Sequence, residues 1–215
     1  MAFAFPSIAM IQTPISSTTT TNIQDQDQDQ RLVYSGITWE QFQLIQAGFA
    51  ESKNIRLAYY QGTIEIIMPG RTHETISRFI CILLSLFCLE SNIEFEPTGS
   101  MTQKREGEVS VEPDESYCFG ESKPIPDLVV EVIFTSGSPK KLRYYQALEI
   151  PEVWFWQDGA FSLYRLRNHN YEPITQSEIP QLAGLDLDLL TRCVAIAQTS
   201  RLEAANTFRN ALKSV

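Results

Sequence analysis

A seven-residue segment, Asp127–Ile133 with the sequence DLVVEVI, combines the composition of a buried strand with a carboxylate in its middle. Its β-branched and apolar residues predict a central β-strand, in which side chains alternate between the two faces. Glu131 then shares a face with Val129 and Ile133. A charged carboxylate in such a row is costly unless a cation or several hydrogen bonds meet it. A metal ion or a lysine would supply that charge, and both belong to the chemistry of phosphodiester hydrolysis.

A second carboxylate, Asp114, is predicted to face Glu131 across a β-hairpin. The segments VSVEPDESY and PDLVVEVIF flank residues 119–126, FGESKPIP, whose glycine and two prolines favour a loop. Symmetric pairing about this loop places Asp114 opposite Glu131, with Cβ atoms about 4.5–5.5 Å apart. Two carboxylates at that distance either repel, so that one pKa rises, or share a divalent cation. Asp127 lies about 13 Å along the strand from Glu131 and is kept as a candidate substrate contact instead.

A positive charge is also needed to orient a water molecule and to stabilise a phosphorane-like transition state. The position two residues after Glu131 holds Ile133 and not a lysine. Lys140 and Lys141 open the next predicted helix, and Lys141 shares a helical face with Tyr145. A helix that returns over the sheet could therefore carry Lys141 to Glu131, while the alternative for Lys141 is a solvent-exposed surface lysine.

The whole chain has 215 residues, a net charge of −9 and a pI near 4.8. This length suits one domain with a core and a tail, and the acidity argues against a protein that coats nucleic acid. The acidity does not exclude an enzyme that binds DNA in one narrow cleft. The four cysteines form no CxxC pair, which favours free thiols and a cytoplasmic location. No secretory signal is recognised, and the apolar stretch 80–89 is too short to span a bilayer.

Residues 1–30 are rich in Ser and Thr and end in QDQDQDQ, which predicts a disordered tail. Residues 31–215 are expected to form a single domain whose folded part begins near Tyr34. Thr38-Trp-Glu-Gln41 predicts a capped helix, and IRLAYY and TIEIIM predict a hairpin around Gln61-Gly62. Thr72 can cap a helix with a broad apolar face. The expected fold is mixed α/β.

Further along the chain, IEFEPTGSM, VSVEPDESY and PDLVVEVIF are expected to be extended. A short helix should follow Pro139, and VWFW, FSLYRL and YEPIT should be strands, with Asp158-Gly159 as the turn between the first two. The stretch from Leu189 to Leu212 is predicted to be one helix.

These residues resemble a known family. The order of elements, with Pro-Asp on one strand and Glu on the next, is similar to the PD-(D/E)XK nuclease core. More narrowly, the chain resembles the Uma-two family of restriction-endonuclease-type proteins. The matching pieces are YYQGTIEIIMPGRTHE, EPDESY, PDLVVEVI and KLRYYQALEIPEVWFW, in order across residues 59–156.

The resemblance implies a restriction-endonuclease-like core, a mixed central β-sheet flanked by helices, with an added N-terminal β-hairpin. It also implies Mg²⁺, or Mn²⁺, held by Asp114 and Glu131, with Lys141 as the catalytic lysine. Glu65 and His73 would border the site. Glu65 is a candidate second carboxylate or proton-transfer group, and His73 a candidate substrate contact; an exposed strand carboxylate and a helix-start histidine are their alternatives.

The expected function is that of a magnesium-dependent DNA endonuclease, with a homodimer as the expected assembly. The rival is a catalytically weak or inactive relative that acts as a nucleic-acid or protein interaction module. The acidic charge, the short TSGSPK loop and the missing strand lysine favour the rival.

Overall fold

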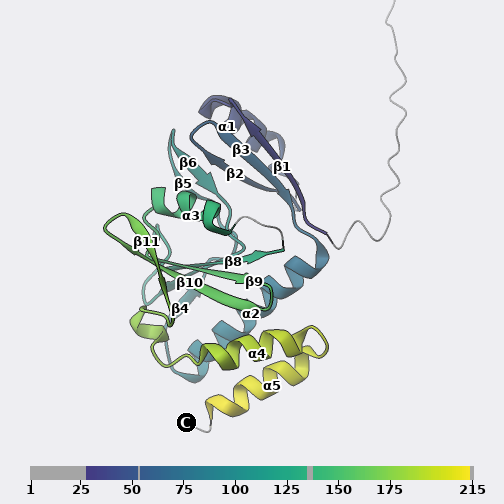
Figure 1. The fold of residues 1–215 in the computed structure, drawn as a ribbon, viewed down its shortest axis with the longest axis vertical. Helices are drawn as coiled ribbons and strands as arrows, with labels where there is room; N and C mark the ends of the chain where they lie inside the picture. Colours follow the sequence, from purple (N-terminus) through teal and green to yellow (C-terminus); the bar gives the residue numbers. More distant parts are fainter. Residues whose placement is uncertain (1–27, 53, 135–137, 214–215) are drawn as a thin grey trace, which may run out of the picture.

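The computed structural model describes residues 28–52, 54–134 and 138–213. In this part of the chain two β-sheets and five α-helices form a mixed α/β fold, as predicted (Figure 1). The larger sheet has the order β11 (Asn170–Ile174), β10 (Ala160–Arg167), β9 (Glu152–Gln157), β8 (Leu128–Ile133), β7 (Glu115–Phe119), β4 (Phe95–Pro97). Strands β8 and β9 are parallel and the other pairs of this sheet are antiparallel.

The smaller sheet is antiparallel and has the order β1 (Gln30–Ser35), β3 (Thr63–Met68), β2 (Arg56–Tyr60), β6 (Val109–Val111), β5 (Gln103–Arg105). The helices are α1 (Trp39–Gly48), α2 (Arg71–Glu90), α3 (Ser138–Ala147), α4 (Leu187–Ala197) and α5 (Arg201–Leu212), with a short 3₁₀ helix at Pro180–Leu182. The hairpin of β2 and β3 is the predicted one. Its turn residues Gln61 and Gly62 both have positive φ, 45° and 82°, as a tight hairpin turn requires.

The central strand β8 is buried on both faces, and its two faces meet different layers. Leu128, Val130 and Val132 pack into a core with helices α2, α4 and α5. On the other face, Val129 and Ile133 pack with residues of α3 and of the smaller sheet. In Figure 1 the smaller sheet and α1 accordingly lie at the opposite end of the molecule from α4 and α5. Glu131 belongs to the second face, so it points toward α3.

Helix α2 is the long core helix. Residues 80–89 alone, the stretch considered from the sequence, are too few for a span. Within the 20 residues of the helix, however, an 18-residue stretch has a mean hydropathy of 1.4 and is long and apolar enough to cross a membrane. Half of that stretch is buried inside the protein, on the face that carries Ile76, Phe79, Ile80, Leu83 and Phe87. A core helix of a globular domain has this pattern.

Several predicted boundaries are wrong. The folded part begins at β1, so Gln30 is part of a strand and not of a tail; residues 1–27 lie outside the described residues. Helix α2 is capped by Gly70 and not by Thr72. Gly70 has no side chain that could cap the helix, so the sequence holds no capping residue from which this helix start could be predicted.

The C-terminal helix is two helices, α4 and α5, which pack against each other and against α2 (Figure 1). Ser200 ends the connection, and its hydroxyl accepts the N–H of Glu203 to cap α5. The segment VSVEPDESY is likewise two strands, β6 and β7, in different sheets. Pro113 lies between them, and a residue without a backbone N–H is disfavoured within a strand that has a neighbour on both sides.

Candidate active site

Asp114 lies where the chain passes from the smaller sheet to the larger one. Strand β7 pairs with β8 in the predicted register, Glu115 with Val130, so Asp114 is the next position, opposite Glu131. Its side chain bonds to β8: Oδ2 accepts the N–H of Val132 at 2.7 Å. Directly before the first residue of β7, the Asp114 carboxylate therefore hydrogen-bonds with the backbone of β8.

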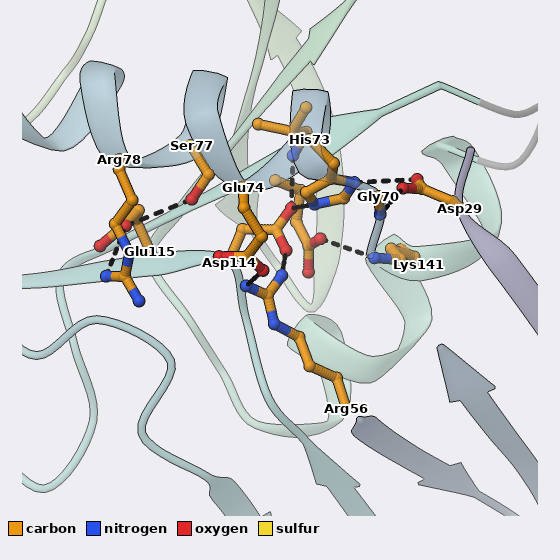
Figure 2. A network of polar contacts seen from close by, with 12 residues as sticks. Asp29, Arg56, Gly70, His73, Glu74, Ser77, Arg78, Asp114, Glu115 and Lys141 are labelled. Carbon is orange, nitrogen blue, oxygen red and sulfur yellow. Dashed lines mark hydrogen bonds and ion pairs between the residues drawn. The ribbon is translucent and has the colours of Figure 1, made fainter. Parts of the chain in front are cut away.

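Two cationic or titratable side chains meet Asp114 from other elements. Arg56, from β2, forms an ion pair with Oδ1 and a second one with Glu74 of α2. His73, also of α2, places Nε2 2.9 Å from Oδ2. Figure 2 shows Asp114 between these two side chains. Asp114 is only 2% exposed, so its carboxylate is neutralised almost entirely by protein groups.

Glu131 is fully buried, with 0% exposure, and both of its oxygens have partners on α3. Lys141 donates to Oε2 at 2.6 Å, and the hydroxyl of Tyr145 donates to Oε1. Burial, together with the adjacent Glu131 carboxylate, raises the pKa of Tyr145 well above its ordinary value. Helix α3 thus returns over the sheet and brings Lys141 to Glu131, the arrangement expected for a helix-borne lysine.

His73 is held from its other side by Asp29. Its Nδ1 lies 2.8 Å from Asp29 Oδ2, and Asp29 Oδ1 accepts the N–H of Gly70 at 2.8 Å. Burial acts to raise the pKa of Asp29, but the hydrogen bonds from His73 and Gly70 outweigh it and hold that pKa below its usual value. Nε2 of His73 is buried and forms no well-aligned hydrogen bond with Asp114 despite the short distance. Asp29 was expected to lie in a disordered tail, and that expectation is wrong.

The other two predicted site residues lie apart from this cluster. Glu65, on β3, is buried and contacts Arg31 and the hydroxyl of Tyr144, the latter at 3.2 Å. It therefore reaches α3, the helix of Lys141, rather than the pair of carboxylates. Asp127 accepts the N–H of Phe119 at 2.8 Å and forms an ion pair with Lys123, so it closes the β7–β8 loop at the far end of β8.

Three site residues were missed by sequence reasoning, namely Asp29, Arg56 and Glu74. Arg56 is a charged residue inside the apolar strand IRLAYY, and that contrast was an available signal. Glu74 follows His73 directly, but the sequence does not indicate that Arg56 is its partner. Asp29 lies in a low-complexity repeat, where nothing distinguishes it from Asp25 and Asp27.

The cluster gathers groups from both sheets and from two helices. Within the residues described, no set of three or more His, Cys, Asp or Glu side chains is arranged to hold a metal ion. The site therefore offers two carboxylates, Glu131 on β8 and Asp114 directly before β7, and each has a cationic partner: Lys141 for Glu131 and Arg56 for Asp114.

Comparison with protein-family models matches residues 39–194 to the Uma2 family, described as "Putative restriction endonuclease". This range runs from α1 into α4 and includes Arg56, His73, Asp114, Glu131 and Lys141, but not Asp29. A search of curated proteins finds no match. The chain therefore belongs to the Uma2 family, within the PD-(D/E)XK-like nuclease superfamily, which confirms the resemblance inferred from its sequence.

Proposed function

We propose that the protein is a magnesium-dependent endonuclease that hydrolyses DNA phosphodiester bonds. The observation that carries the proposal is the set of Asp114, Glu131 and Lys141, in which both carboxylates are buried and the lysine is 2.6 Å from Glu131. In this set a water molecule would attack phosphorus while the bond from phosphorus to the leaving nucleotide oxygen breaks. Family membership supports the reaction class.

The donor groups fit Mg²⁺. This ion usually takes one or two carboxylates and completes its shell with water and substrate phosphate, so Asp114 and Glu131 suffice. A structural zinc site would need four side-chain ligands, which the described residues do not bring together. Arg56, now on Asp114, would have to give way to the ion. When bound, Mg²⁺ would act as a Lewis acid that offsets charge on the phosphate; Mn²⁺ would fit the same oxygens.

The remaining groups have positioning roles in this proposal. Lys141 would orient the attacking water and offset developing negative charge. Tyr145 holds the second oxygen of Glu131, so that carboxylate keeps one orientation. Glu65 acts at a distance, since it binds Tyr144 on the helix that carries Lys141.

A second function, that of a non-catalytic interaction module, has one specific observation in its favour. Each carboxylate already has a cation from the chain itself, Arg56 on Asp114 and Lys141 on Glu131. Such a site is electrostatically complete without metal. The two functions therefore differ in whether a divalent cation can displace Arg56.

Metal-dependent melting separates them. For wild type, 10 mM Mg²⁺ at a Kd of about 1 mM stabilises by roughly 1.4 kcal/mol, or about 3–6 °C for a chain of this size. Asp114→Asn should abolish the shift. Asp127→Asn is the matched control, because it removes a lysine-paired aspartate at the other end of β8 and should leave the shift intact.

Cleavage of supercoiled and single-stranded DNA is then assayed with the same three proteins. Metal-dependent cutting by wild type and Asp127→Asn alone supports the nuclease. An unchanged melting temperature at millimolar Mg²⁺ and Mn²⁺, with no cleavage, would overturn the nuclease proposal and favour the interaction module.

A further inference from the structure

A groove runs along α2, beside the residues of that helix that contact the candidate active site. A cavity of about 480 Å³ lies between α2, the end of α4 and the start of α5, and a second one of about 350 Å³ continues it along α2. Arg71, Thr75, Phe79 and Arg201 line both cavities, so the two form one continuous depression. Arg78 lines the second. We call this depression the arginine groove.

The cations of the arginine groove are poorly compensated. Within the described part of the chain, the side chains of Arg71 and Arg201 form no ion pair and no hydrogen bond. Arg78 contacts Glu115 at 3.1 Å, but its side chain remains 57% exposed. Among the residues described, Glu74 is the one carboxylate that lines the groove, and it already forms an ion pair with Arg56. Three guanidinium groups therefore gather in one place on a protein whose net charge is −9.

The arginine groove borders the candidate active site through a single helix. In the first turns of α2, His73, Glu74 and Ser77 contact the polar network, while Arg71 and Thr75 line the groove. Figure 2 shows Arg78 on this helix at one end of that network. Seven residues separate Arg71 from Arg78, which is about 10 Å along a helix. A nucleic-acid strand at 3.4 Å per nucleotide covers this length with roughly three phosphates.

We propose that the arginine groove binds the phosphates of the DNA strand next to the bond that is cut. Guanidinium groups suit phosphate oxygens because their N–H groups are rigid and can bind two oxygens at once. Thr75 adds a hydroxyl donor, and the buried ring of Phe79 forms an apolar floor. An acidic protein needs such a local site, since the rest of its charge repels DNA. This inference rests on the proposed nuclease function.

The test measures DNA binding without cleavage, so that it does not depend on catalysis. Fluorescence anisotropy in EDTA follows a labelled single-stranded and a labelled double-stranded oligonucleotide over a salt series. Each phosphate contact contributes about 0.7 (single-stranded) to 0.9 (double-stranded) to the slope of log affinity against log salt. Arg71→Ala/Arg201→Ala should therefore lower the slope by about 1.4–1.8, which is a loss of about 25- to 60-fold in affinity at 0.1 M salt.

The matched control is Arg192→Ala/Arg209→Ala, which removes the same charge from α4 and α5 outside the groove. It should change the slope by less than half as much. Equal losses in both double variants would overturn the proposal, because the effect would then be one of net charge. The proposal also fails if the groove variant binds DNA as tightly as wild type. If wild type nevertheless cuts DNA, only the groove proposal is overturned and the proposed nuclease function is unaffected.

Inorganic phosphate is the remaining probe. Displacement of the oligonucleotide by phosphate at an equal concentration of phosphate groups would overturn the strand assignment and make the groove a small-anion site. Displacement only at a large molar excess supports a groove that binds several linked phosphates at once.

Discussion

Removal of the Lys141 ammonium should destabilise the protein strongly, whereas Lys140→Ala should be nearly silent. Glu131 has 0% exposure and Lys141 is its cationic partner at 2.6 Å, so Lys141→Ala leaves a buried carboxylate with the hydroxyl of Tyr145 as its remaining partner. Such an uncompensated charge costs about 3–5 kcal/mol. Because Lys141 keeps 15% exposure, water can enter, and we expect about 3 kcal/mol.

For a domain of this size the loss corresponds to a melting temperature lower by about 6–12 °C. Lys140 is exposed and its side chain points about 100° away around α3, so Lys140→Ala should stay within about 0.5 kcal/mol of wild type. Thermal melts and urea titrations of both variants give the two numbers. The Lys141 variant should also lose DNA cleavage while it still binds metal.

A double variant tests the cause. Glu131→Gln replaces the charge by a neutral amide, so in the Lys141→Ala background it should recover part of the lost stability. Millimolar Mg²⁺ should do the same, because a divalent ion replaces the missing cation. If Lys141→Ala melts within about 1 °C of Lys140→Ala, the ion pair contributes little and the electrostatic reasoning is wrong.

Three further predictions concern other parts of the protein. Deletion of residues 1–29 should lower the melting temperature relative to deletion of residues 1–27, since only the longer deletion removes the partner of His73; equal melts would show that Asp29 contributes nothing. Tyr145→Phe should cost about 1–3 kcal/mol in urea titrations, and more than Tyr144→Phe, because its hydroxyl serves a fully buried carboxylate; the reverse order would contradict this. Burial raises the pKa of Cys88 to about 12, so at pH 8 roughly one thiol in ten thousand is ionised and the native protein should react slowly there with a thiol reagent; fast labelling of Cys88, identified by mass spectrometry, would refute this.

The central pair of the site could be read from the sequence because strand geometry is regular. Alternation along DLVVEVI assigns Glu131 to the face of Val129 and Ile133, and that assignment is correct. The hairpin register follows from a short loop with turn residues, and it too is correct. Lys141 followed from helical spacing, since a side chain four residues from Tyr145 must share its face.

The groups that surround the pair could not be predicted, because they depend on which elements pack together. Arg56 belongs to a sheet whose docking on the central sheet leaves no local pattern. The division at Pro113 was missed because VSVEPDESY is extended on both sides of the break. In the sequence, Asp29 cannot be distinguished from Asp25 and Asp27 of the same repeat; only the folded structure shows that it contacts His73.

Because the chain changes sheets at Pro113, the Asp114 side chain connects the smaller sheet to the larger one. One oxygen of its carboxylate is fixed to the backbone of β8, and the other is fixed to Arg56 on the smaller sheet. A cation that takes Asp114 from Arg56 would therefore also release the smaller sheet from the larger one at this point. Occupancy of the site would then be linked to this one polar contact between the sheets, while Val129 and Ile133 still pack against the smaller sheet.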